Sequence, residues 1–115
     1  MNRYIEFVEK EIEFCQLKIN KAKEEKIYRE TIALIVPENK NINLVTVNEI
    51  EISLNEYKIK CLHQIKCVLE AWEVVKRYTS TPEDVVEGGY YFIKGLDDEF
   101  ETIKKALELE DDKEC

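Results

Sequence analysis

Apolar residues recur at alternating spacings of three and four along three segments of the chain, the pattern of helices that pack lengthwise against one another. The seam of the first segment consists of Ile5, Val8, Ile12, Cys15, Ile19 and Ala22, with Glu and Lys at most positions between. This pattern predicts a helix over residues 2–35, which ends near Val36 because Pro37 disfavours helical geometry at the residue before it.

The second segment predicts a helix over residues 47–78. Thr46 and Glu49 have the spacing of a capping box, and Val45 can pack on Ile50 as a hydrophobic staple. The seam continues through Val47, Ile50, Leu54, Tyr57, Cys61, Val68, Ala71, Val75 and Tyr78, and it is widened by Leu62, Ile65, Leu69 and Trp72.

The third segment predicts a helix over residues 82–108. Thr81 is a suitable N-cap, Pro82 suits the first helical position, and Glu83 and Asp84 complement the helix dipole. The seam consists of Val86, Gly89, Ile93, Leu96, Phe100, Ile103 and Leu107. Residues 110–115 lack an apolar period and are expected to fray as an acidic tail.

Three helices of similar length with short connections predict an all-α fold, an elongated antiparallel three-helix bundle with coiled-coil-like packing. The first two helices would each be about 50 Å long and the third about 40 Å. Residues 1–109 would form a single domain. The short apolar runs around the first connection also allow a β-hairpin within residues 31–47.

All three glycines of the chain lie within "EGGYYFIKG", residues 87–95. Their spacing fits neither a dinucleotide loop nor a P-loop. Gly89 falls on the seam, where a missing side chain lets a neighbouring helix approach closely. Gly88 and Gly95 fall on one outer face, with Tyr91 and Phe92 between them. A helix break at the glycine pair is the alternative to a continuous helix, because each glycine costs about 1 kcal/mol in a helix interior.

The first helix carries a second set of apolar residues away from its seam. In an up-down-up bundle, its start lies at the same end as the start of the third helix, so these residues would adjoin the outer glycine face. We call the combined surface the aromatic–glycine patch and predict that it binds a protein partner or a second copy: Phe7, Phe14, Leu17, Gly88, Tyr91, Phe92 and Gly95. The alternative is that Phe7 and Phe14 pack inside one bundle.

The net charge of −8 argues against direct binding of nucleic acid, which needs a basic face to neutralise phosphates. It is compatible with a basic protein partner, including a nucleic-acid-handling protein that an acidic inhibitor would occlude. Small phage-borne anti-defence proteins have this profile, and so do many adaptors. No apolar run is long enough for a bilayer, and the four cysteines show no CxxC spacing. We therefore expect a cytoplasmic protein with free thiols.

The candidates for chemistry are few, and we expect no enzyme, no cofactor and no metal site. His63, the only histidine, has Cys67 one turn away and Glu70 beyond, without a second ligand pair. Glu70 and Glu73 lie on the second predicted helix, and Asp98 and Glu101 lie on the third. If the two pairs faced each other, their carboxylates could hold Mg²⁺ against a nucleoside triphosphate and allow its hydrolysis. This layout resembles that of the all-α nucleotide pyrophosphohydrolases, although the expected glutamate pair followed by an E-x-x-D helix is not reproduced. A self-assembling structural bundle is the remaining alternative.

Overall fold

The computed structural model describes residues 2–36, 42–76 and 81–114, without the side chains of residues 2, 42, 43 and 108–114. These residues form α1 (Asn2–Ile35), α2 (Ile42–Glu70), the one-turn α3 (Trp72–Val75) and α4 (Pro82–Glu114). No strand occurs among them, and residues 31–35 and 42–47 are helical, so the described part of the first connection contains no hairpin. The all-α prediction is confirmed.

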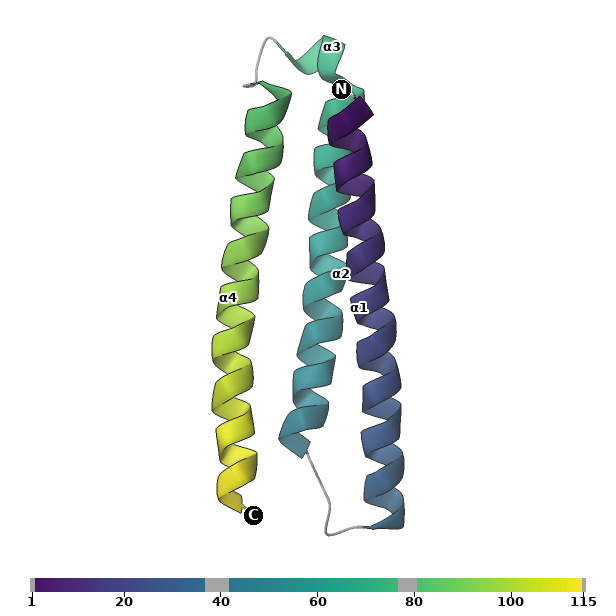
Figure 1. Cartoon of the computed structure of the whole chain (residues 1–115), viewed down its shortest axis with the longest axis vertical. Helices are drawn as coiled ribbons and strands as arrows, with labels where there is room; N and C mark the ends of the chain where they lie inside the picture. The colour runs from purple at the N-terminus through teal and green to yellow at the C-terminus, as the bar shows by residue number, and fades with distance from the viewer. Residues whose placement is uncertain (1, 37–41, 77–80, 115) are drawn as a thin grey trace.

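The three long helices lie alongside one another in an elongated molecule of 60 × 22 × 16 Å. Figure 1 shows α2 running antiparallel to both α1 and α4, with α3 set across the end of α2. Both outer helices pack on α2, more extensively α1 than α4, but α1 and α4 barely contact each other. The arrangement is therefore an open form of the antiparallel three-helix bundle that the sequence predicted.

The core lies mainly between α1 and α2. The α1 seam is confirmed by the burial of Val8, Cys15, Ile19 and Ala22. On α2 the buried line follows the predicted seam only in part, because Val47 is buried but Tyr57 is exposed. Four of the residues buried on α2 recur every seven positions, as in a coiled coil: Asn48, Asn55, Leu62 and Leu69. Lys58 is buried as well, outside this period.

A polar network connects α1 to α2 at the buried Asn48. Arg29 Nη1 donates a hydrogen bond to Asn48 Oδ1 (2.6 Å) and another to the Leu44 carbonyl oxygen (3.0 Å). Asn48 Nδ2 in turn donates to Glu25 Oε2 (3.1 Å). Because a buried amide is costly without partners, these bonds favour the register that places Asn48 opposite Arg29.

Two boundaries of α2 differ from the prediction. The helix begins at Ile42 rather than at residue 47, so Thr46 lies inside it and does not cap its start. The predicted helix over residues 47–78 is interrupted at Ala71 (φ −93°, ψ 19°), where the Val74 amide donates to the Ala71 carbonyl across three residues instead of four. Such a tightened turn is common at the end of a helix.

The start of α4 confirms the predicted cap, because the Asp84 amide donates to Thr81 Oγ1 at 3.2 Å. The helix runs without interruption through the glycine pair, and no described glycine has a positive φ. It also continues to Glu114, so residues 110–114 of the acidic segment that was expected to fray are helical. On the seam, Phe100 is buried but Ile103 is 45% exposed.

Gly89 packs directly against Ile65 of α2. A Cβ atom at this position would overlap Ile65 Cδ1 and lie 3.3 Å from Ile65 Cγ1. The prediction that Gly89 allows a close helix approach is therefore confirmed. No helix in the described part of the chain has a stretch long and apolar enough to cross a membrane.

Candidate functional site

A groove runs between α1 and α4, with α2 as its floor. It arises because the two outer helices pack on different sides of α2 and leave space between them. Its apolar half has a volume of about 130 Å³. Its walls and floor are formed by Phe7, Val8, Glu11, Phe14, Cys15 and Lys18 of α1, Lys58, Leu62 and Ile65 of α2, and Val86, Tyr90, Ile93, Lys94 and Asp97 of α4.

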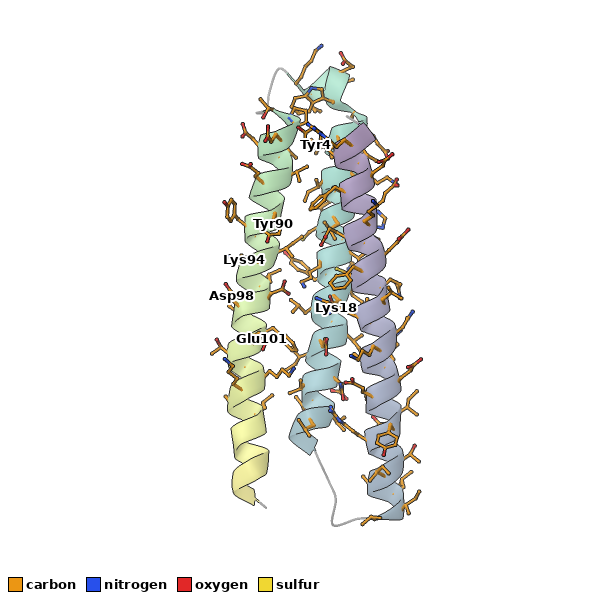
Figure 2. All side chains as sticks on the ribbon, viewed as in Figure 1. Tyr4, Lys18, Tyr90, Lys94, Asp98 and Glu101 are labelled. Atoms are coloured by element: carbon orange, nitrogen blue, oxygen red, sulfur yellow. The ribbon has the colours of Figure 1, made fainter. Side chains whose placement is uncertain are left out.

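Aromatic side chains flank this apolar half and remain accessible to solvent. Phe7 is 43% exposed, Phe14 53% and Tyr90 53%. Figure 2 shows Tyr90 and Lys94 on α4 and Lys18 on α1. The Lys18 ammonium lies 4.5 Å from the centre of the Phe14 ring, a cation–π distance. The groove therefore presents three aromatic rings that the chain covers only in part.

An ion pair between a buried lysine and a partly exposed aspartate crosses the floor of the groove from α2 to α4. The Lys58 side chain is only 3% exposed, and its ammonium pairs with Asp97, whose side chain is 42% exposed. Burial of a charge is costly unless it is paired, so Asp97 stabilises the charged Lys58. Nearby, burial raises the pKa of the Cys15 thiol, partly opposed by the positive charges of Lys58 and Lys18. Cys15 is thus an inert core thiol rather than a nucleophile.

Beyond this ion pair the groove becomes polar. Lys18, Lys58 and Asp97 line both halves, which makes the two halves contiguous. The polar half, of about 240 Å³, is completed by Glu51, Leu54, Asn55, Phe100 and Glu101. Asn55 is 2% exposed; its Nδ2 donates to the Glu51 carbonyl oxygen (2.8 Å), and its Oδ1 has no hydrogen-bond partner.

The structure divides the predicted aromatic–glycine patch among different surfaces. Phe7 and Phe14 line the groove, and their complete burial within one chain, the alternative interpretation, is not observed. Tyr91 lies at the groove's edge, where it shares a shallow hollow with Phe7 and Tyr90. Its ring packs edge-to-face on Tyr90, with centroids 6.0 Å apart.

The other members of the patch lie outside the groove. Phe92 packs against Tyr57 of α2, with ring centroids 6.3 Å apart and planes inclined by 57°. A Cβ at Gly88 or Gly95 would meet no atom within 4 Å, so both positions face open space. Leu17 is 65% exposed and does not line the groove.

Several groove residues were not identified from the sequence, among them Tyr90 and Lys58. Tyr90 lies four residues after Val86 and three before Ile93, so helical spacing places it beside the seam and was a usable signal. Lys58 gave no such signal, because a lysine between apolar residues normally indicates a solvent-facing position.

The candidate carboxylates are not brought together. Glu70 pairs with Lys66 (3.7 Å) and Glu73 with Lys76 (2.7 Å). The Lys76 ammonium lowers the pKa of Glu73 through a hydrogen bond and its charge, as expected of an ion pair at the surface. His63 and Cys67 are exposed, and the described residues contain no group of three or more His, Cys, Asp or Glu side chains that could hold a metal ion.

No family model, curated protein or solved structure matches this chain.

Proposed function

We propose that this chain is a non-enzymatic protein-interaction module whose groove between α1 and α4 binds an apolar face of a partner helix. The observation that carries the proposal is the exposure of Phe7, Phe14 and Tyr90 along one groove. Large exposed apolar surfaces on a small protein commonly mark interaction sites, and aromatic residues are enriched at the centres of interfaces. Ile65 on the floor is partly exposed and provides further apolar surface for the occupant.

The shape of the groove favours a helix as the occupant. The chain supplies three long helices, of which the outer two contact α2 but hardly each other. A fourth helix placed between them would complete a four-helix arrangement with ordinary packing distances of about 8–10 Å. An amphipathic helix in an apolar groove is a common mode of peptide recognition.

The acidity of the chain guides the choice of partner. A net charge of −8 favours association with a basic protein, which includes proteins that handle nucleic acid. We therefore propose an inhibitor or adaptor role, of the kind that small phage or mobile-element anti-defence proteins have. The described cysteines are free thiols, in keeping with a cytoplasmic location.

Affinity capture from cells that naturally express the chain tests this proposal. Phe14→Ser should abolish capture of the partner, because it replaces an apolar groove side chain with a small polar one. Tyr28→Ser is the matched control, since Tyr28 is also on α1, is 67% exposed and does not line the groove. A partner retained equally by both variants would contradict binding in the groove.

A second copy of the chain is the alternative occupant, which would make the molecule a self-assembling bundle. Sedimentation equilibrium of the purified protein distinguishes the two. A dimer that Phe14→Ser converts to a monomer, and that Tyr28→Ser leaves intact, would identify the occupant as a second copy.

A further inference from the structure

The side of α1 that faces away from α2 carries a second line of residues, here called the outer seam. Its members are exposed and recur at spacings of three, four or seven positions: Phe14, Leu17, Lys21, Glu24, Tyr28 and Ile35. Because a helix has 3.6 residues per turn, the outer seam lies nearly opposite the buried seam of Val8 and Cys15. Its spacing is that of a coiled-coil interface.

The chain leaves the apolar surface of the outer seam uncovered. Ile27 and Leu34, which precede Tyr28 and Ile35, extend this surface along one edge and are exposed as well. Among the described residues, α1 carries seven of the thirteen exposed large apolar side chains. The helix packs on α2 by its other side and barely contacts α4. An apolar stripe of this length on a small protein indicates an interaction surface.

Two opposite charges at the centre of the outer seam indicate what covers it. Among the described residues, neither Lys21 nor Glu24 forms an ion pair. An antiparallel pairing of two α1 helices, centred between residues 22 and 23, places Lys21 opposite Glu24 of the second copy. Two-fold symmetry repeats this contact, so both charges of both chains are paired.

The same register also matches the apolar residues on either side of the charges. Leu17 faces Tyr28 of the second copy, and Phe14 faces Thr31. Thr31 Oγ1 already donates to the Ile27 carbonyl oxygen within α1 (2.8 Å), so its hydroxyl needs no partner from the second copy. The outer seam is therefore complementary to itself in both charge and hydrophobicity.

Other pairings of the outer seam leave its charges unmatched. A parallel pair sets Lys21 against Lys21 of the second copy and Glu24 against Glu24. An antiparallel pair shifted by one heptad sets Glu24 against the ring of Phe14 or of Tyr28. A charge covered without a partner is costly, and polar residues at such positions commonly fix the register of a coiled coil.

We infer that the outer seam of α1 binds the outer seam of a second copy, as an antiparallel coiled coil from residue 10 to residue 35 of each chain. At 1.5 Å per residue, the contact is about 39 Å long. This dimer uses a different surface from the proposed groove, whose floor is α2 and whose far wall is α4. Phe14 belongs to both surfaces, so the test relies on residues that belong to only one of them.

Sedimentation equilibrium of the full-length chain tests the inference by reversing charges. Lys21→Glu should raise the Kd of the dimer at least about 10-fold, because it sets like charges opposite each other, and Glu24→Lys should do the same. The Lys21→Glu/Glu24→Lys chain should dimerise as the wild type does, since the exchanged charges pair again. Lys23→Glu is the matched control, because it changes the net charge equally at an exposed α1 position outside the outer seam and should leave the Kd unchanged.

Three results would overturn the inference. The first is a wild-type chain that remains monomeric at every concentration measured. The second is a dimer that Lys21→Glu does not weaken, as a parallel pair predicts, and the third is a Lys21→Glu/Glu24→Lys chain no more dimeric than either single variant.

Tyr90→Ser separates this dimer from one formed through the groove. Tyr90 lines the groove from α4 and is not part of the outer seam, so the inferred dimer should survive its replacement, whereas Tyr28→Ser should weaken it. A dimer that is lost in Tyr90→Ser and kept in Lys21→Glu would be formed through the groove. That result overturns the inference and leaves the proposed function of the groove in place.

Discussion

Replacing Gly89 with alanine tests how closely α4 packs on α2. In an open helical position this substitution stabilises a protein by about 1 kcal/mol, because alanine has the higher helix propensity. At Gly89, however, the new Cβ would overlap Ile65 Cδ1. Overpacking of this kind costs about 1–3 kcal/mol. The two effects oppose each other, so we expect Gly89→Ala to lower the free energy of unfolding by about 0–2 kcal/mol.

Gly88 and Gly95 provide internal controls in the same helix. A Cβ at either position would meet nothing within 4 Å. Gly88→Ala and Gly95→Ala should therefore each stabilise the protein by about 1 kcal/mol. Urea unfolding followed by circular dichroism at 222 nm gives all three differences with the same assay.

A double-mutant cycle with Ile65→Val identifies the cause of the difference. Ile65→Val removes the Cδ1 atom that the alanine would overlap, and on its own should cost about 1 kcal/mol. With that atom absent, Gly89→Ala should become neutral or stabilising, because Ile65 Cγ1 at 3.3 Å requires only a small adjustment. We expect a favourable coupling of about 1–2 kcal/mol between the two substitutions.

Equal stabilisation by Gly89→Ala and Gly88→Ala, with no coupling to Ile65→Val, would refute this reasoning. It would mean that α4 can shift away from α2, or Ile65 can rearrange, without lowering the free energy of unfolding, and that Gly89 has no packing role.

Four further measurements test other parts of the structure. Asp97→Asn should destabilise the protein by about 2 kcal/mol in urea unfolding, because it leaves the Lys58 ammonium buried without its partner, and Lys58→Met in that background should recover most of the loss. Asn48→Ala should cost about 3 kcal/mol in the same assay, since it removes two hydrogen bonds to charged groups; a loss below about 0.5 kcal/mol would contradict the network. Iodoacetamide should label the exposed Cys67 much faster than the buried Cys15, as read by peptide mass spectrometry. The raised pKa of Cys15 lets the folded protein keep a proton that the unfolded chain loses, so its contribution to stability should fall as pH rises past about 9, a trend absent in Cys15→Ala.

The features that depend on local sequence were predictable. The three-and-four spacing of apolar residues identified the long helices, Pro37 correctly placed the end of α1 at Ile35, and Thr81 caps α4 as expected. Gly89 was placed correctly on a close helix contact, because a glycine on an apolar seam has few other structural roles. Each of these depends on the chemistry of a few neighbouring residues.

The features that depend on packing between helices were not predictable in the same way. The buried line of α2 includes Asn48, Asn55 and Lys58, polar residues that a hydrophobic pattern places at the surface. Their burial depends on partners from other helices, such as Arg29 and Asp97. The angular position of α4 around α2, which opens the groove, is likewise set by contacts between helices rather than by the period of either one.

Because α1 and α4 barely contact each other, we expect α4 to detach from the rest of the molecule as a separate unit. Detaching α4 breaks one helix–helix interface, whereas detaching α2 breaks two, so amide hydrogens of α4 should exchange with solvent through smaller, less costly openings than those of α2. A ligand bound to both α1 and α4 would link these helices, so that α4 would open only together with the rest of the molecule. Slower exchange along the whole of α4 would then accompany binding, even at amides remote from the contact.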